Sequence, residues 1–159
     1  QRLAASGAEA LRFDYYGSGE SAGEDEELSV GSAVEDALVA VDEALALAKV
    51  RHVTLVGLRA GALVAALAAP RARAVDRLVL WEPVVDDYEF TALPPRTLLL
   101  VAVDSPAHRQ LRDHLAALPN GANVQFEIMP CTPPWLATSD DGVGPAPPDV
   151  LARIAGWDT

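Results

Sequence analysis

The chain of 159 residues contains one cysteine, Cys131, and only 6% of its residues are aromatic. A single cysteine excludes an intrachain disulfide, and we expect a reducing, cytoplasmic compartment. No apolar run approaches the roughly 20 residues that a membrane-spanning helix needs. Basic residues are also few. The chain has 12 lysines and arginines against 23 aspartates and glutamates, which gives a formal net charge of -11. Nucleic acids bind basic surfaces, so this charge argues against them as partners.

Apolar residues, by contrast, are abundant. They make up 50% of the chain, and the mean hydropathy is +0.15, as in folded globular proteins. The length predicts one domain over residues 1–159. We expect no cofactor and no metal ion, because the glycines of residues 15–21 are followed neither by a helix nor by the Lys-Ser or Lys-Thr pair of a phosphate-binding loop.

The most informative stretch is VTLVGLRAGALVAALAA, which runs from Val53 to Ala69. Its first four residues are an apolar, mostly β-branched run typical of a buried strand, and Ala62–Ala69 suit a buried helix. Between them, Gly57 to Gly61 has the frame of the G-x-S-x-G nucleophile elbow, a sharp turn between a strand and a helix. Arg59 occupies the central position, where that motif has serine.

The remaining patterns predict alternating strands and helices. Further strands are expected at Ala8–Asp14, Asp76–Glu82, Thr97–Val103 and Val124–Met129. Further helices are expected at Gln1–Ser6, Ser32–Lys49, Ala107–Leu118 and Val150–Trp157, the last with Asp149 as N-cap. Irregular connections are expected at Asp86–Pro95 and Pro130–Pro148. This alternation predicts an α/β fold, a three-layer sandwich with a mostly parallel sheet between helices.

Ligands of such sheets bind at the carboxyl ends of the strands. Five residues with reactive or charged side chains fall at this predicted edge: Asp14, Arg59, Glu82, Asp104 and Cys131. We therefore expect the functional site there.

The segment FDYYGSGES, Phe13 to Ser21, resembles the F-D-x-x-G-x-G-x-S loop that follows a strand of α/β-hydrolases. Its pairing with the elbow, with LWEPV at Leu80–Val84 and with Pro133-Pro134-Trp135 resembles the exosortase A system-associated hydrolases. Those α/β-hydrolase-like proteins occur with bacterial exopolysaccharide and protein-sorting loci. The resemblance implies an α/β-hydrolase fold and an esterase- or thioesterase-like ancestry.

The chain departs from the pattern that this resemblance implies. The family fold has strands that come before the one expected at Leu11, including the strand that lies in the sheet between the Leu11 strand and the Val53 strand. It also has an oxyanion loop ahead of Gln1, and neither is found here. We therefore expect a truncated sheet with an open edge, through which the chain could self-associate. The short connection at Asp86–Pro95 leaves no room for a helical cap.

The resemblance also indicates where a catalytic triad would lie. Asp104 closes a strand at the acid position, although a helix N-cap is an equal alternative, and Glu82 is a second candidate acid. No histidine follows His114, and the three histidines present, at positions 52, 108 and 114, precede the position expected for the base. Cys131 lies near that position, either as a small buried apolar residue or as a thiol nucleophile.

Arg59 cannot act as a nucleophile, because its guanidinium stays protonated and offers only hydrogen-bond donors. It either forms a salt bridge with Asp14, Glu82 or Asp104, or receives the carboxylate or phosphate of a ligand. For the second alternative, the expected ligand contacts are Arg59, Leu58, Ala60, Tyr15 and Glu82.

Three hypotheses about function follow. The first is a binding or accessory protein with a degenerate elbow and no serine-triad activity. The second is an active ester or thioester hydrolase that uses other residues. The third is a subunit that pairs through its sheet edge.

Overall fold

A computed structural model describes residues 9–84, 90–118, 123–131, 138–139, 142–143 and 146–158. The helix predicted at Gln1–Ser6 and the Pro133-Pro134-Trp135 motif lie outside these residues, as does part of the connection predicted at Asp86–Pro95.

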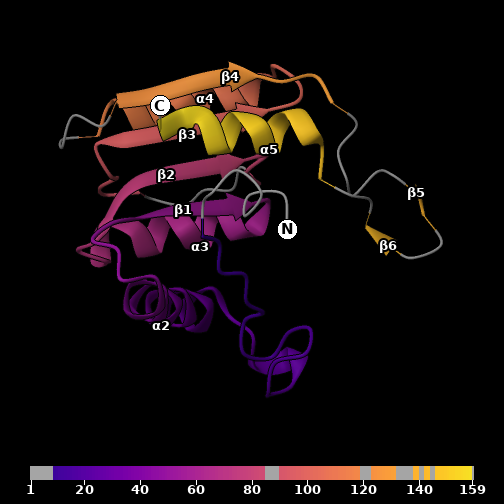
Figure 1. The fold of residues 1–159 in the computed structure, drawn as a ribbon. Helices are drawn as coiled ribbons and strands as arrows, with labels where there is room; N and C mark the ends of the chain where they lie inside the picture. The colour runs from indigo at the N-terminus through magenta and orange to yellow at the C-terminus, as the bar shows by residue number, and fades with distance from the viewer. Residues whose placement is uncertain are drawn as a thin grey trace.

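The centre of the fold is a sheet of four parallel strands in the order β1-β2-β3-β4 (Figure 1). The strands are β1 (Val53–Leu58), β2 (Val75–Trp81), β3 (Arg96–Val101) and β4 (Asn123–Ile128). The α-helices are α2 (Val30–Ala48), α3 (Ala60–Ala68), α4 (Pro106–Ala116) and α5 (Pro148–Ala155). Short 3-10 helices cover Asp25–Glu27, Ala69–Arg71 and Gly156–Asp158. These four strands and four α-helices agree with the predicted elements to within two residues at most ends, and the α/β fold class is confirmed.

Helices cover both faces of the sheet. Strand order advances in one direction, so right-handed crossovers place α3 and α4 on the same face. On that face, Leu80 of β2 and Leu99 of β3 share a core cluster with Ala66 of α3 and Leu115 of α4. The alternate strand residues point the other way and pack against Val150, Ile154 and Trp157, at α5 and just beyond it. Figure 1 shows α5 crossing in front of the strands. The predicted three-layer sandwich is therefore confirmed.

Helix α2 lies outside these layers and packs mainly on α3. Buried Ala33, Val34 and Ala37 of α2 share a cluster with Val64 and Ala68 of α3. Its N-cap is Ser29, whose side chain accepts a hydrogen bond from the Ser32 N–H at 3.0 Å. The helix therefore starts two residues before the predicted Ser32, because the serine that caps it is Ser29.

Three sequence predictions about local structure are wrong. Residues 9–14 are not a strand: they are irregular, and Leu11 and Phe13 are 50% and 40% exposed. A strand exists only when a neighbour accepts its backbone hydrogen bonds, and β1 forms a ladder with β2 alone. The loop predicted at Pro130–Pro148 contains the antiparallel pair β5 (Thr138–Ser139) and β6 (Gly142–Val143) and the start of α5. Asp149 is not an N-cap, because α5 begins at Pro148 after Pro147.

Among the described residues, none of the helices combines the length and the apolar character needed to cross a membrane. The same residues contain no helix between β2 and β3, where a cap would be inserted.

Candidate functional site

The site begins at the turn between β1 and α3. Strand β1 ends at Leu58, α3 begins at Ala60, and Arg59 joins them with φ 55° and ψ −121°. A positive φ is uncommon for a residue with a side chain, and such strained residues concentrate at functional sites. The turn is held from both sides, because the Arg59 N–H donates to the Trp81 carbonyl at 3.0 Å and the Ala62 N–H donates to the Arg59 carbonyl at 3.0 Å.

Glycine at position 57 allows the strand and the helix to meet this closely. A Cβ atom on Gly57 would lie 2.3 Å from the Gly61 carbonyl oxygen and 2.5 Å from the Ala62 Cα. Both neighbours are backbone atoms that cannot move aside without opening the turn. The elbow predicted from the G-x-x-x-G frame is therefore present, with Arg59 at its corner.

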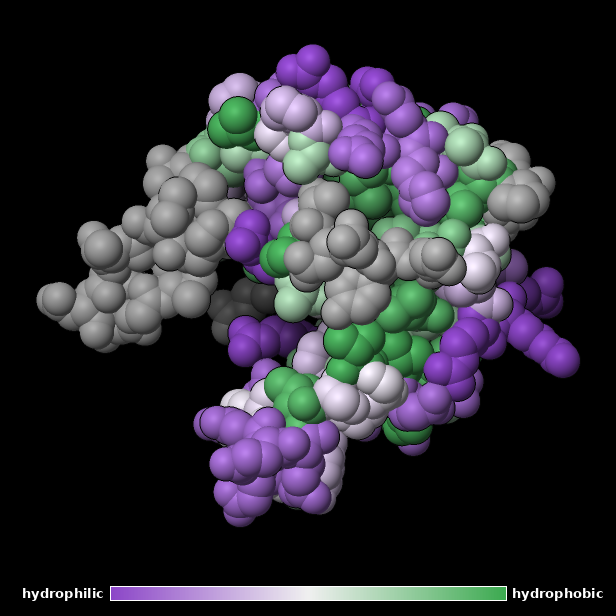
Figure 2. All heavy atoms as spheres, turned by 180° about the vertical axis from the view of Figure 1, so that it is seen from behind, coloured by the Kyte–Doolittle hydropathy of each residue, from purple (hydrophilic) through white to green (hydrophobic). Residues whose placement is uncertain are grey.

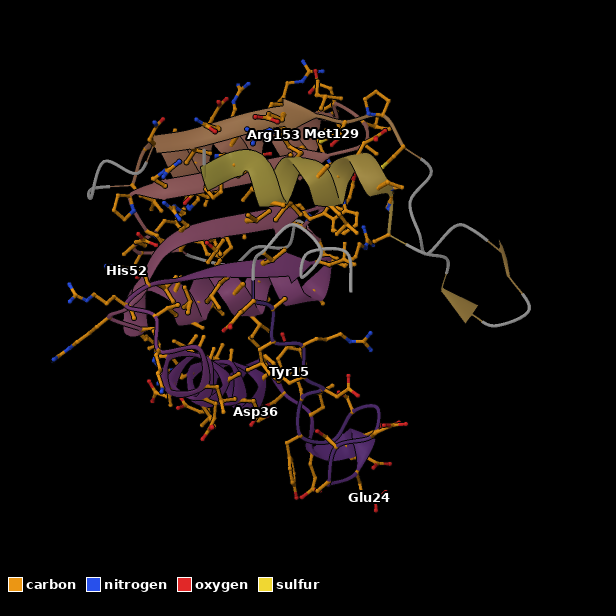
Figure 3. All side chains as sticks on the ribbon, in the orientation of Figure 1. Tyr15, Glu24, Asp36, His52, Met129 and Arg153 are labelled. Atoms are coloured by element: carbon orange, nitrogen blue, oxygen red, sulfur yellow. The ribbon has the colours of Figure 1, made fainter. Side chains whose placement is uncertain are left out.

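The corner is accessible. Leu58, Arg59 and Ala60 are all exposed. Tyr15 approaches from the amino-terminal loop, and its hydroxyl lies 3.7 Å from the position that a Cβ on Gly61 would take. Burial raises the pKa of Tyr15, and the negative charge of Asp36 raises it further, so the phenol keeps its proton and remains a donor. Figure 3 shows Tyr15 and Asp36 close together, where the loop meets α2.

Backbone hydrogen bonds continue past the strand ends and align the residues at this edge. The Arg59 N–H reaches the end of β2, the Glu82 N–H donates to Leu100 of β3 at 2.8 Å, and the Met129 N–H donates to Val101 of β3 at 2.8 Å. Arg59, Glu82 and Met129 therefore lie along the carboxyl edge of the sheet, each just after a different strand.

Glu82 is buried, with 7% of its surface exposed, and its φ is 46°. Its carboxylate accepts a hydrogen bond from the Ala102 N–H in the turn after β3. A buried carboxylate needs such a partner, and this one joins the end of β2 to the end of β3. This contact does not bear on the role of catalytic acid expected for Glu82, which stays a prediction.

Cys131 follows β4 and packs beside Met129 against the core cluster under α5. Burial raises the pKa of its thiol, and the negative charge of Glu82 raises it further. The thiolate is the reactive form of cysteine, so this environment opposes nucleophilic activation.

Asp104 is 39% exposed and forms an ion pair with Arg109, with 2.8 Å between Oδ1 and Nε. The N-cap of α4 is the neighbouring Ser105, whose hydroxyl accepts from the His108 N–H at 3.1 Å. The alternative that Asp104 is the N-cap is therefore wrong: with Pro106 at the first position of the helix, the cap falls on the residue just before it.

The histidines lie on other parts of the molecule. His52 is 3.9 Å from Asp76, at the amino edge of the sheet, opposite the elbow (Figure 3). The His108 ring is 3.3 Å from the Val103 carbonyl, and the His114 ring is 6.4 Å from the ring of Phe90. Within the described part of the chain, no group of three or more His, Cys, Asp or Glu side chains could hold a metal ion.

Each of the three carboxylates predicted as salt-bridge partners of Arg59 has a contact of its own, and the salt bridge with Arg59 stays a prediction. Asp14 accepts from the Glu20 N–H at 3.3 Å, Glu82 accepts from Ala102, and Asp104 pairs with Arg109. Sequence reasoning missed one polar contact near the site, in which Asp36 of α2 accepts from the Tyr16 N–H at 2.7 Å. No local motif signals a contact that spans 20 residues.

A parallel sheet between helical layers, with a strained strand–turn–helix elbow at its carboxyl edge, defines an α/β-hydrolase fold. The chain belongs to the hydrolase family described as serine aminopeptidase, S33, whose model matches residues 1–126. A search of curated proteins gave no match.

Proposed function

We propose that this α/β-hydrolase-fold protein lacks serine-triad activity and binds a small anionic molecule at Arg59. The observation that supports it is the exposed Arg59 at the corner of the elbow, where the G-x-S-x-G motif places its nucleophile. We further propose an accessory role in a bacterial exopolysaccharide or protein-sorting context, on the resemblance of the sequence motifs, and a cytoplasmic location, on the single cysteine.

The chemistry of the corner suits an anion. The planar guanidinium can donate two parallel hydrogen bonds to a carboxylate or phosphate. Arg59 also stands at the N-terminus of α3, where the helix dipole disfavours a cation by about 0.3–1 kcal/mol and favours an anion. The Tyr15 hydroxyl offers a third donor, while Leu58 and Ala60 supply apolar contacts on either side.

The surroundings of the elbow support the loss of triad chemistry. Asp104, the candidate acid, is paired with Arg109 on α4, and the ring contacts of the described histidines are with groups other than the elbow. The thiol of Cys131 is kept protonated by burial and by Glu82. A nucleophile and an oriented base within hydrogen-bonding distance are the minimum for acyl transfer.

Calorimetric titration with phenyl phosphate and benzoate at low ionic strength tests the binding proposal. We expect saturable binding to the protein and a loss of about tenfold or more in affinity for Arg59→Ser, since the substitution removes a charge-assisted pair. Arg59→Lys should recover part of the affinity. Arg109→Gln is the matched control, because Arg109 is an exposed arginine on α4 that pairs with Asp104, after β3 and not after β1. Equal affinities for the protein and for Arg59→Ser would contradict the proposal.

The alternative function is an active ester or thioester hydrolase. Two measurements distinguish it from the binding proposal: the rate of p-nitrophenyl acetate hydrolysis and covalent labelling by a fluorophosphonate probe. We expect background turnover and no labelling. If Arg59→Ser retained the hydrolysis rate and the probe labelled a residue other than position 59, the hydrolase hypothesis would replace the binding proposal.

A second candidate function rests on the open edge of the sheet. Among the described strands, β1 pairs only with β2, and Val56 and Leu58 of β1 are 43% and 37% exposed. Edges of this kind accept further strands, so we propose self-association through β1. Gel filtration over a hundredfold range of concentration should show a shift in apparent mass that Val56→Lys abolishes. A constant monomeric mass would exclude it.

A further inference from the structure

A groove separates the amino-terminal segment from α2, apart from the elbow. It has a volume of about 530 Å³ and is lined from one side by residues 11–22 and from the other by α2. This volume lies within the range of small-molecule sites, roughly 300–1,000 Å³. Figure 2, which views the molecule from behind, shows hydrophobic residues gathered between hydrophilic regions on that face.

The apolar part of the lining is unusually exposed. Leu11 and Phe13 come from the segment, and Val39 and Leu47, which are 62% and 73% exposed, come from α2. Tyr16, 43% exposed, adds a second aromatic ring. Exposed apolar groups that line one concave surface indicate a binding site more often than scattered ones do.

The polar part of the lining carries a single sign of charge. Asp14, Asp36 and Glu43 contribute carboxylates, and none of the described residues that line the groove is basic. Two of these carboxylates are held in place by backbone donors: Asp36 by the Tyr16 N–H at 2.7 Å and Asp14 by the Glu20 N–H at 3.3 Å. Glu43 is exposed on α2 and forms no hydrogen bond or ion pair with the described residues.

The loop that carries Tyr16 is packed tightly. A Cβ on Gly17, which has φ 77°, would lie 2.6 Å from the Glu24 carbonyl oxygen, and one on Gly23 would lie 2.6 Å from the Tyr16 ring. The Gly17 N–H also donates to the Ala22 carbonyl at 2.8 Å. Glycine at position 23 therefore allows the loop to lie close to the Tyr16 ring.

We propose that this groove binds an amphipathic cation, a small molecule with an alkyl or aryl body and an ammonium head. The body would contact Leu11, Val39 and Leu47. The head would lie near the carboxylates of Asp36 and Glu43 and against the rings of Phe13 and Tyr16, since aromatic faces attract cations. An anionic ligand would meet three like charges and no basic partner in the lining. This inference stands independently of the anion site at Arg59.

The proposal is tested by comparing the affinities of three probes of equal chain length: octyltrimethylammonium, octan-1-ol and octanoate. The ammonium compound is titrated below the concentration at which it forms micelles. We expect the ammonium to bind about fivefold or more tightly than the alcohol, and octanoate to bind most weakly, because the groove adds a charge interaction to apolar burial. Glu43→Gln and Asp36→Asn should each weaken ammonium binding about two- to fivefold and leave the alcohol unchanged. Asparagine retains an oxygen that can accept from Tyr16, so the loop should stay in place.

Asp42→Asn is the matched control, because Asp42 is an exposed acid on the same helix that does not line the groove. It should change ammonium affinity by less than twofold. Equal binding of the three probes would overturn the proposal, as would absence of ammonium binding or an effect of Asp42→Asn as large as that of Glu43→Gln. Because Arg59→Ser should leave ammonium affinity unaltered, failure here is distinguishable from failure of the anion site.

Discussion

Two regions of this molecule use apolar residues in opposite ways. Around β2, β3 and α5, the side chains of Leu78, Val79, Leu98 and Leu99 are completely buried. In the amino-terminal region, residues 9–28 with α2, several large apolar side chains are exposed, among them Leu11, Val39 and Leu47. Stability is therefore concentrated in the region around β2, β3 and α5, while the amino-terminal region offers apolar surface for binding.

The largest expected effect is on the free energy of unfolding, and it differs between substitution of a buried leucine and of an exposed leucine. Leu98→Ala should lower the free energy of unfolding by about 2–5 kcal/mol, because it leaves a cavity between the sheet and α5. Leu47→Ala, at a 73% exposed position of α2, should change it by less than about 0.5 kcal/mol. Urea denaturation measures both. Similar losses in the two variants would mean that the amino-terminal region is packed as tightly as the core.

The next largest difference in the free energy of unfolding is expected between alanine substitutions at two glycines, Gly57 and Gly31. Gly57→Ala should cost about 1–3 kcal/mol, since its Cβ would overlap the backbone of Gly61 in the elbow. Gly31→Ala in α2 should be stabilising by about 0.5–1 kcal/mol, because the nearest atom to its Cβ is 3.8 Å away and alanine favours helix. Thermal unfolding followed by circular dichroism measures both the loss and the gain of stability. A stable Gly57→Ala protein would show that strand and helix do not meet closely at the elbow.

The link between the ends of β2 and β3 predicts a smaller difference in stability between two variants. Glu82→Ala leaves the Ala102 N–H without its acceptor, which should cost about 1–3 kcal/mol. Glu82→Gln keeps an acceptor oxygen and should lose less than half as much. Denaturation of the two variants decides this, and equal losses would show that the charge of Glu82 matters and the hydrogen bond does not.

Much of the central sheet could be predicted from the sequence, because buried parallel strands are short apolar runs and the elbow has a glycine frame. Residues 9–14 show where such reasoning fails. Leu11 and Phe13 have the pattern of a strand, yet strand formation depends on a neighbour that no local pattern reveals. Among the described strands, none pairs with residues 9–14.

The candidate site could be predicted only in part. Position within the alternating elements was enough to place Arg59 and Glu82 at one edge of the sheet. The partners of the side chains were not predictable, because Asp104 binds Arg109 on the next helix and Asp36 binds a loop 20 residues away. Such contacts depend on how α2 and α4 are rotated against the sheet.

The smallest expected effect concerns the thiol of Cys131. Its raised pKa means that less thiolate is present at pH 8 than in free cysteine, so iodoacetamide should react more slowly than with a model thiol. The rate should increase as the pH rises toward the shifted pKa. Glu82→Gln removes the second cause of the shift and should speed the reaction about twofold. Reaction as fast as that of a free thiol would show that Cys131 is activated and would reopen its role as a nucleophile.

The central claim is that the guanidinium at the corner of the elbow receives an anion. Nuclear magnetic resonance of the arginine Nε–Hε groups during a phenyl phosphate titration tests it most directly. We predict a saturable shift of the Arg59 signal, with the signals of Arg109 and Arg153 unchanged, because these two arginines lie on α4 and α5 and not at the turn between β1 and α3. An Arg59 signal that stays in place while the anion binds elsewhere, or does not bind, would contradict the account.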